Sequence, residues 1–543
     1  MLCTCLLLLG LPAMAPGCGD CRPIGCWSAA VARDYGSVTP VAVLVSASAD
    51  RAVFLLGYFD GTVNFGSNGV IDERTSVGSK DVFITKFNAD GSGAWTRTFG
   101  GPDWEECTAI AQDHASNILI AGNFSSTVDF DPGEGVSERT PEGLVNGFVL
   151  TLSPEGTYRT VLTFGAGNGR VGPAGMALDQ DDNIFLTGLF DHTVDFDPGA
   201  GVELHTSNLN TPDVFVTKLN ADGSHAWTRT FGGRAFDMGY QLEVDADSNV
   251  FVAGEFRGEV DFDPGGGADV FTALGPSALF LTKLNADGSY GWTRVWQIST
   301  ILPQHLLARS PDGALYLTGI LSGTVDFDPT EGFDFRTGDV DAFVIKVNAD
   351  GSYGWTRVFP GDGQGGLDLD LAADECGNLL VAGAFTGTMD FDPGPGVDQH
   401  TSMGGYDIFL IKLLADGSYA WGRVIGGANN EWLPVVAASA GGLVLAGVGV
   451  ETTDLDPGCV DAERGSDAAA GEMFVTELRC NQPQADANSD GRVDLLDFVR
   501  FQNCFTGPAP TTCNVGCPIF DFDGDDDIDL GDFLFFEHAL STP

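Results

Sequence analysis

Short apolar runs alternate with polar turns along most of the chain. One such unit begins with the apolar run at 176–178 and continues, after a turn, through a second run at 184–190. A β-branched segment of alternating polarity follows at 213–219, then an Asn-Ala-Asp-Gly turn and a segment that contains Trp227. Alternation with a period of two residues and glycine-containing turns predict strands joined by hairpins. The unit therefore predicts four antiparallel strands in about 65 residues.

The same unit recurs along the chain, and its most recognisable segment is Asp-Phe-Asp-Pro-Gly. The first acidic position of this segment and its weaker copies are Asn64, Asp129, Asp195, Asp261, Asp326, Asp390 and Asp454. Neighbouring copies are 64 to 66 residues apart. A fixed period indicates a repeat architecture in which each unit buries its faces against its neighbours. Seven four-stranded units predict an all-β fold, a seven-bladed β-propeller.

An aromatic residue marks the fourth strand of each unit and predicts how the ring closes. Six copies are Trp95, Tyr158, Trp227, Trp292, Trp355 and Trp421. The seventh is Trp27, which lies 68 residues before Trp95, and no such strand follows the last apolar run at 473–478. We therefore expect the segment near Trp27 to complete the blade that begins near residue 435. This N-terminal strand would leave no open sheet edge.

Five of the aromatic strands carry an arginine two residues further on, on the same side of the strand. These arginines are Arg97, Arg229, Arg294, Arg357 and Arg423. One interpretation is a ring of tryptophans that stack on sugars. The other is packing between blades, with each arginine paired to a repeated aspartate such as Asp81, Asp213 or Asp407. Because a residue repeated in most units usually belongs to the frame, we favour packing.

The connections of the predicted ring fall into two groups at opposite ends. The Asn-Ala-Asp-Gly turns and the Asp-x-Asn turns near 113–117, 179–183 and 245–249 are nearly identical, so they belong to the frame. The connections between units differ in sequence, and variable loops on a fixed frame are where binding sites usually lie. The candidate ligand-binding residues are Trp104, Glu105, Arg234, Tyr240, His305, Asn430 and Trp432.

The Asp-Phe-Asp-Pro-Gly copies lie at the same end as the variable connections. Their two aspartates share one side of the strand, and Pro-Gly forms a turn. The preferred interpretation is an Asx turn that leads into Pro-Gly. A calcium site in each blade is the alternative, because paired carboxylates are ligands for hard cations.

Two recurring strand motifs carry a resemblance to a known family. The first is Asn-x-x-x-x-Gly at 183–188, 249–254 and 378–383, and the second is Asp-x-Phe-x-x-Lys at 81–86, 213–218 and 341–346. With these motifs, residues 26–479 resemble the seven-bladed propeller (SBBP-type) repeat family of bacterial secreted proteins. The resemblance implies a fold and no shared activity.

The C-terminal segment has the spacing of two EF-hand calcium loops, at 486–497 and, 35 residues later, at 521–532. In the second loop Asp526 stands where glycine is usual. The predicted ligands of the two Ca2+ ions are Asp486, Asn488, Asp490, Arg492 through its carbonyl, Asp494, Asp497, Asp521, Asp523, Asp525, Asp527 through its carbonyl, Asp529 and Asp532. An acidic, solvated tail is the alternative.

Each predicted loop leads into a short apolar helix, at 495–505 and 533–540. The pair of units resembles a type I dockerin domain over 486–541. That resemblance implies calcium-dependent folding and docking to a cohesin-like partner. Where that family has Ser-Thr type partner contacts, this chain has Leu495-Leu496 and Leu530-Gly531. Successive apolar residues at 533–536 suit a docking face, and packing onto the propeller is the alternative.

Composition excludes some functions. The net charge is −50, from 76 acidic and 26 basic residues, so binding to nucleic acid or to an anionic membrane surface is not expected. Residues 1–15 have the pattern of a secretory signal, and no other stretch approaches a membrane span. The seven histidines share no register, and no hydrolase or phosphate-loop motif occurs. We expect a secreted, extracellular or cell-surface protein.

These patterns together predict a domain order and a function. The order is a signal peptide at 1–15, a propeller at 16–479, a linker at 480–485 and a helical, dockerin-like domain at 486–541. The expected function is binding without catalysis: the propeller recognises an extracellular ligand, a glycan or a protein, and the tail attaches it to a partner. The alternative is a polysaccharide hydrolase or lyase carried on a dockerin.

Overall fold

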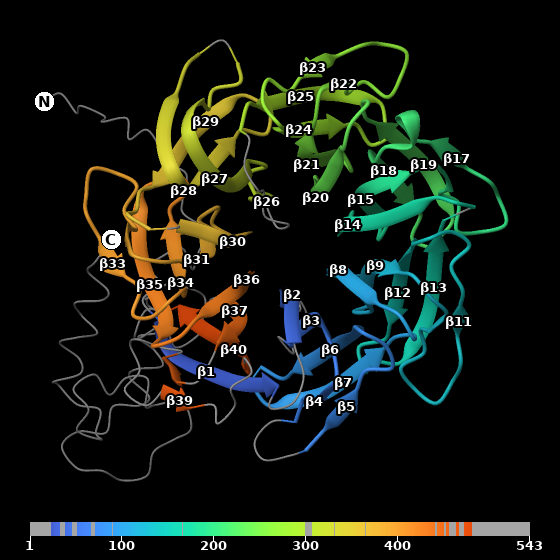
Figure 1. The fold of residues 1–543 in the computed structure, drawn as a ribbon, viewed down its shortest axis with the longest axis horizontal. Coiled ribbons are helices and arrows are strands. Elements are labelled where there is room, and N and C mark those ends of the chain that lie inside the picture. The colour runs from blue at the N-terminus through green and yellow to red at the C-terminus, as the bar shows by residue number, and fades with distance from the viewer. Residues whose placement is uncertain are drawn as a thin grey trace, which may run out of the picture. The chain divides into compact units, whose positions relative to one another are not determined.

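The computed structural model describes residues 23–32, 38–45, 52–66, 71–89, 91–165, 167–298, 307–330, 332–363, 365–439, 442–449, 452–454, 463–465 and 472–480. Seven four-stranded units of antiparallel strands surround one axis (Figure 1). Most of them belong to a compact unit formed by Cys26–Ser439 and Val444–Glu477. The predicted seven-bladed propeller is confirmed. The predicted calcium-binding loops and helices lie outside the described residues.

Each blade is numbered from its innermost strand outwards. Blade 1 contains β2 (Val38–Val45), β3 (Val53–Phe59), β6 (Asp81–Phe87) and β7 (Gly93–Phe99), and blade 2 contains β8 (Glu105–Gln112), β9 (Ile118–Phe124), β12 (Asn146–Leu152) and β13 (Tyr158–Phe164). Blade 3 contains β14 (Arg170–Leu178), β15 (Ile184–Asp191), β18 (Asp213–Leu219) and β19 (His225–Phe231), and blade 4 contains β20 (Met238–Val244), β21 (Val250–Phe256), β24 (Ala278–Leu284) and β25 (Tyr290–Trp296). Blade 5 contains β26 (Leu307–Arg309), β27 (Leu315–Asp326), β28 (Phe335–Val347) and β29 (Tyr353–Phe359), and blade 6 contains β30 (Gly365–Ala373), β31 (Leu379–Phe385), β34 (Asp407–Leu413) and β35 (Tyr419–Gly427).

Blade 7 is built from both ends of the propeller sequence. Its strand order is β36 (Glu431–Ser439), β37 (Gly442–Gly449), β40 (Glu472–Cys480) and β1 (Pro23–Ala32). Strand β1 contains Trp27, so the N-terminal strand completes the last blade as predicted. In the resulting ring each outermost strand lies at the periphery, and the innermost strands surround the axis (Figure 1).

A glycine and a phenylalanine face each other on the second and third strands of six blades. Gly188 pairs with Phe215 and Gly254 pairs with Phe280, for example. A Cβ at Gly254 would lie 2.0 Å from the Met238 carbonyl oxygen and 2.8 Å from the Phe280 ring. The innermost strand and the ring therefore occupy the space of a side chain, which only glycine leaves empty. This contact explains the glycine and phenylalanine of the two recurring strand motifs.

The connection between the second and third strands of each blade is called its arm. Most arms contain a two-stranded ribbon: β4 (Thr62–Asn64) with β5 (Glu73–Thr75), β10 (Val128–Asp129) with β11 (Glu138–Arg139), β16 (Thr193–Asp195) with β17 (Leu204–Thr206), β22 (Glu259–Asp261) with β23 (Val270–Thr272), β32 (Thr388–Asp390) with β33 (Gln399–Thr401), and β38 (Thr452–Asp454) with β39 (Glu463–Gly465). The arm of blade 3 also holds the short 3-10 helix η1 (Asn208–Asn210), and in blade 5 the ribbon continues β27 and β28. Strand β38 also pairs with β35, so the arm of blade 7 extends the sheet of blade 6.

The phenylalanine of each Asp-Phe-Asp segment joins two neighbouring blades. Phe262, in the arm of blade 4, is 0 % exposed. Its ring lies 5.3 Å from Phe231 of blade 3 and 5.2 and 5.1 Å from Phe256 and Phe280 of blade 4. Phe130 makes the corresponding contacts between blades 1 and 2. The arm therefore inserts a side chain into the apolar layer between adjacent blades.

The apolar cores lie between blades. One cluster joins buried residues of blades 1 and 2, and similar clusters join each following pair up to blades 5 and 6. The cluster that closes the ring contains Phe59 and Phe65 of blade 1 together with Val444 and Met473 of blade 7. The second and third strands of most blades are covered on both faces by the neighbouring blades. Their sequences are therefore nearly continuous apolar runs.

We expect Phe262→Ala to lower the free energy of unfolding by about 3–5 kcal/mol, because it removes a buried ring and leaves a cavity between two blades. Phe335→Ala is the matched control, since Phe335 lies in the arm of blade 5 and is 63 % exposed. The control should cost less than about 1 kcal/mol. Urea unfolding followed by tryptophan fluorescence measures both. Equal losses would contradict the insertion of the arm between blades.

Candidate ligand-binding site

One end of the ring consists of repeated turns. In the turn between the first two strands of blade 2, the Asp113 carboxylate accepts hydrogen bonds from the Asn117 backbone N–H and side-chain amide, at 2.7 and 2.8 Å. The same pair of bonds recurs at Asp179, Asp245 and Asp374. The arms and the connections between blades lie at the opposite end, because the strands are antiparallel. Because the same turns recur from blade to blade, the end that they form belongs to the frame of the ring.

The repeated tryptophan and arginine pack one blade against the next. The Arg229 guanidinium lies 5.4 Å from the Trp227 ring, and its Nε donates to the Gly288 carbonyl oxygen at 2.9 Å. Gly288 belongs to the Asn-Ala-Asp-Gly turn of the following blade. Equivalent bonds are made by Arg97, Arg294 and Arg357. The packing interpretation is confirmed, because these arginines are engaged in the frame.

The expected pairing of these arginines with repeated aspartates is wrong. Asp213 instead accepts the Asn208 backbone N–H at 2.7 Å, and Asp81 and Asp407 hold backbone N–H groups of their own arms. Each of these aspartates begins a third strand, where the arm leaves several backbone donors to be satisfied. A carbonyl oxygen of the next blade is the closer partner for the arginine.

The Asp-Phe-Asp segment forms the predicted Asx turn. Asp129 Oδ1 accepts backbone N–H groups of Asp131 and Ser137 at 3.1 and 2.8 Å. In the weakest copy, Asn64 Oδ1 makes the same two bonds, to Gly66 and Asp72. An amide therefore does the same work as the carboxylate. Among the described residues, no group of three or more His, Cys, Asp or Glu side chains is arranged to hold a metal ion.

A buried carboxylate stands at the start of the innermost strand in three blades. Glu105, Asp237 and Glu431 are each 0 % exposed. Each accepts the backbone N–H of the glycine four residues earlier, at 2.7, 2.6 and 3.0 Å. Glu105 thus fixes the connection that precedes it and lies out of reach of a ligand in this structure. The prediction of Glu105 as a ligand-binding residue is therefore replaced by a structural role.

Burial changes the protonation of these carboxyl groups. It raises the pKa of Glu105 to about 7, against the opposing effect of the hydrogen bond from Gly101. It also raises the pKa of Asp237 to about 6 and that of Asp213 to about 7, and the negative charge of Asp237 adds to the shift of Asp213. Burial disfavours the ionised form because the protein interior solvates charge poorly.

The other predicted residues are distributed over three blades. Trp104, beside Lys80, is half-buried before blade 2. At blade 7, Asn430 is exposed, its Oδ1 accepts the Tyr406 backbone N–H at 2.9 Å, and Trp432 is half-buried. Arg234 is exposed in the connection to blade 4 and Tyr240 is half-buried on β20. His305 lies outside the described residues, as do the predicted calcium ligands.

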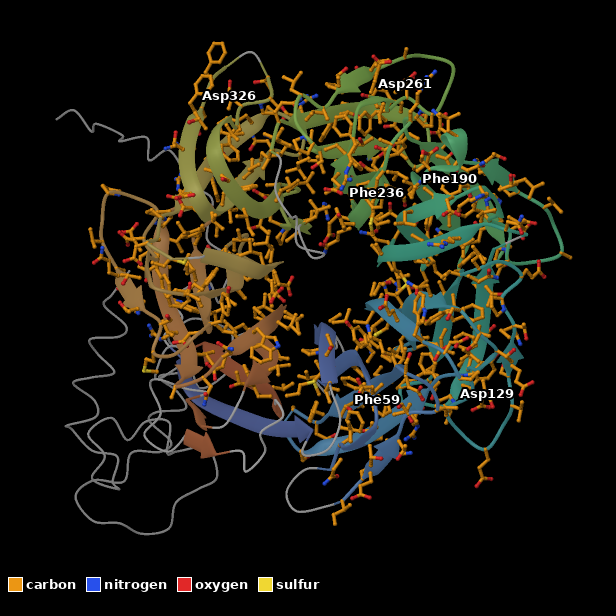
Figure 2. The ribbon with its side chains drawn as sticks, in the orientation of Figure 1. Phe59, Asp129, Phe190, Phe236, Asp261 and Asp326 are labelled. Atoms are coloured by element: carbon orange, nitrogen blue, oxygen red, sulfur yellow. The ribbon has the colours of Figure 1, made fainter. Side chains whose placement is uncertain are left out.

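At blade 4 a predicted residue lies among charged and aromatic neighbours on two elements. The Glu255 carboxylate acts electrostatically on the Tyr240 hydroxyl, and its Oε1 lies 3.3 Å from Arg257 Nη2. The Arg257 guanidinium in turn lies 5.1 Å from the centre of the Phe236 ring. Figure 2 places Phe236 beside the innermost strands, whereas Asp129, Asp261 and Asp326 lie at the periphery. Sequence reasoning missed Phe236, Glu255 and Arg257, which alignment of the repeats would have marked as departures from the frame.

The exposed apolar side chains lie almost entirely on the arms. Of the fourteen large apolar side chains exposed in the described part of the chain, thirteen are in arms. They include Phe333 and Phe335, whose rings stack 5.9 Å apart. These residues give six blades an apolar patch on an otherwise acidic protein. Exposed apolar patches of this kind are typical of surfaces that contact other molecules.

The fold defines the chain as a seven-bladed β-propeller. No known family model matches it. An uncharacterized WD repeat-containing protein of Acanthamoeba polyphaga mimivirus is 23 % identical over 434 residues, covering 66 % of this chain and 30 % of that protein. The chain thus spans less than a third of that relative's length.

Three solved structures are distantly similar. A quinohemoprotein alcohol dehydrogenase from Pseudomonas putida has 11 % identity and a TM-score of 0.35, covering 89 % of this chain and 78 % of that one. A phage phi92 endosialidase has 11 % identity and a TM-score of 0.33, covering 84 % and 69 %. A Bacillus licheniformis rhamnogalacturonan lyase has 13 % identity and a TM-score of 0.25, covering 83 % and 71 %. Similarities at this level carry no argument about function.

Within the described ranges, no helix has the length and hydropathy of a membrane span. Cys107 is a buried free thiol on β8, and burial raises its pKa, whereas Cys376 is disulfide-bonded.

We expect the propeller to become more stable as the pH falls from about 8 to about 5. The folded chain holds the Glu105 proton more tightly than the unfolded chain, because burial raises the pKa of Glu105 to about 7. This stabilisation is complete below about pH 4 and is lost as the pH rises through about 7.

Thermal unfolding of wild type and Glu105→Gln at the two pH values measures the effect. The variant should show a smaller gain at low pH, because its side chain has no proton to bind. Glu134→Gln, at an exposed position in an arm, is the control that removes one negative charge from the surface. Identical pH dependence in Glu105→Gln and wild type would contradict the prediction.

Proposed function

We propose that this chain is a secreted or cell-surface binding protein, whose propeller holds an extracellular ligand at the end formed by the connections between blades. The observation that carries this proposal is the cluster at blade 4. Tyr240, Glu255 and Arg257 depart from the repeat there, and the Arg257 side chain is 48 % exposed. Variation on a frame that is otherwise repeated is where recognition is expected.

Binding without catalysis fits the carboxyl groups of this end better than hydrolysis does. The groups whose pKa is raised to between about 6 and 7 include Glu105 and Asp237, which are 0 % exposed and hold backbone N–H groups. A catalytic acid or base must come within hydrogen-bond reach of the substrate. A polysaccharide hydrolase or lyase is the second candidate, because carboxyl groups with such pKa values can exchange protons near neutral pH.

The C-terminal segment supplies the second half of the proposal. Its two loops have the oxygen spacing of calcium sites, and we propose that Ca2+ folds a dockerin-like unit that attaches the propeller to a cohesin-like or other surface protein. The SBBP-type resemblance of 26–479 belongs to the same proposal. The apolar patches on the arms support a role in an assembly, because a ligand at the ring's axis would leave them uncovered.

We expect the full-length chain to bind two Ca2+ ions in a calorimetric titration. Asp490→Ala and Asp525→Ala should each remove one binding event, because each deletes a ligand of one loop. Asp129→Asn is the control: it lowers the charge of an arm and keeps the acceptor that Asn64 provides in blade 1. Fewer than two sites in wild type would contradict the calcium loops, and a loss in Asp129→Asn would indicate a site in the arms.

We expect the full-length chain to be retained on at least one polysaccharide of a panel of plant, microbial and animal glycans without cleaving it. Affinity electrophoresis measures retention, and a reducing-end assay with ultraviolet detection of unsaturated products measures cleavage. Retention without products supports a binding protein. Release of reducing ends or unsaturated products would favour the hydrolase or lyase.

A further inference from the structure

Among the five described blades whose second strands end on a phenylalanine in the same register, blade 4 alone has oppositely charged residues on both sides of it. The residue before the last phenylalanine of this strand is Tyr58 in blade 1, Asn123 in blade 2, Leu189 in blade 3, Glu255 in blade 4 and Ala384 in blade 6. The residue after that phenylalanine is, in the same order of blades, Asp60, Ser125, Asp191, Arg257 and Thr386. The backbone register of these positions is the same in all five blades. The glutamate and arginine of blade 4 are therefore not needed to form the strand.

Two groups contact the guanidinium of Arg257, and a third fixes its backbone. Glu255, which is 7 % exposed, contacts its Nη2 at 3.3 Å, and the Phe236 ring lies beside it at 5.1 Å. The Asp237 carboxylate accepts the Arg257 backbone N–H at 2.9 Å. Burial and the nearby Glu255 charge raise the Tyr240 pKa, so the Tyr240 hydroxyl stays neutral beside that carboxylate. Such support orients an arginine before a ligand arrives.

Most hydrogen-bond donors of this arginine are free. A guanidinium has five N–H groups, and in the described part of the chain only the Glu255 contact engages one of them. Arg234, which is exposed, lies two residues before Phe236 in the same connection. Blade 4 thus contributes two arginines to this end of a chain whose net charge is −50. A planar guanidinium with free donors binds a carboxylate by two parallel hydrogen bonds.

We propose that the cluster of Phe236, Tyr240, Glu255 and Arg257 binds the carboxylate of a short acidic glycan, with Arg257 as the direct partner and Glu255 as the positioning residue. This inference rests on the proposed function and names the ligand class of the same end. The net charge favours a short ligand with few carboxylates over a long polyanion, because each added charge is repelled by the protein. The half-buried aromatic side chains supply the apolar surface on which the ring of a sugar packs.

Calorimetric titration of the full-length chain with uronic-acid trisaccharides tests the inference. The probes are trimers of galacturonate, glucuronate and mannuronate, each as the free acid and as the methyl ester, with maltotriose as a neutral sugar and hexaglutamate as an acidic peptide. Esterification removes the charge and leaves the sugar. At least one free acid should bind at least tenfold more tightly than its ester.

The variants separate this site from general electrostatics. Arg257→Gln and Arg234→Gln should each weaken binding of the free acid by about tenfold or more, because each removes a charge-assisted hydrogen bond. Arg336→Gln should bind as wild type does. Arg336→Gln also removes one positive charge. The Arg336 side chain is 46 % exposed and is paired with an aspartate in the arm of blade 5. Thermal unfolding shows whether each variant is folded. If Arg257→Gln does not fold, Arg234→Gln tests the inference in its place.

Each outcome bears on one proposal. Preference for the free acid, lost in the Arg257 or Arg234 variant and kept in Arg336→Gln, supports the inference. Equal binding of acid and ester, or binding unaffected by both variants, overturns the carboxylate site and leaves the propeller a binding protein. Binding of hexaglutamate alone overturns the glycan assignment. Binding of none of the probes overturns the inference, whereas retention on the polysaccharide panel then still supports the proposed function.

Discussion

The propeller depends on the apolar layers between its blades. A single four-stranded blade has no core of its own, since the residues that it buries face the sheets on either side. The arms of blades 1 to 6 each insert a phenylalanine between neighbouring blades, and Phe262 contacts rings of blades 3 and 4. Burial of a ring of this size contributes about 2–3 kcal/mol relative to an exposed one. The Asp-Phe-Asp segment, which is the most conspicuous repeat of the sequence, therefore connects neighbouring blades.

The repeated polar groups also connect neighbouring blades or fix their arms. Arg229 crosses to the turn of the next blade, and Asp129 and Asn64 fix the arms by one acceptor oxygen each. These groups have structural roles. Few of the described polar side chains at the end formed by the connections between blades are then available to bind a ligand. Blade 4 differs, because Glu255 and Arg257 are both charged, whereas each other blade compared has at most one charged residue at these two positions. A site made by departures from a repeat leaves the architecture of the ring unchanged.

The sequence predicted the architecture well because strand periodicity and turn chemistry are local. Four strands per unit and the return of the chain to a strand at Trp27 followed from spacing alone. Partners across a blade boundary depend on the twist between sheets, so the Arg229 bond to Gly288 was assigned to an aspartate instead. Glu105 illustrates the same limit: its position in a variable loop suggested binding, and only its burial reveals that it holds backbone. The Arg257 cluster joins three segments and has no signature within any one of them.

The pairing of β1 with β40 has a consequence for biosynthesis. During translation β1 emerges first, yet its sheet partner is the strand Glu472–Cys480, made some 440 residues later. Until then β1 has no partner strand, and its unpaired edge can be joined by other chains. The last sheet can therefore close only after the strand Glu472–Cys480 has been synthesised.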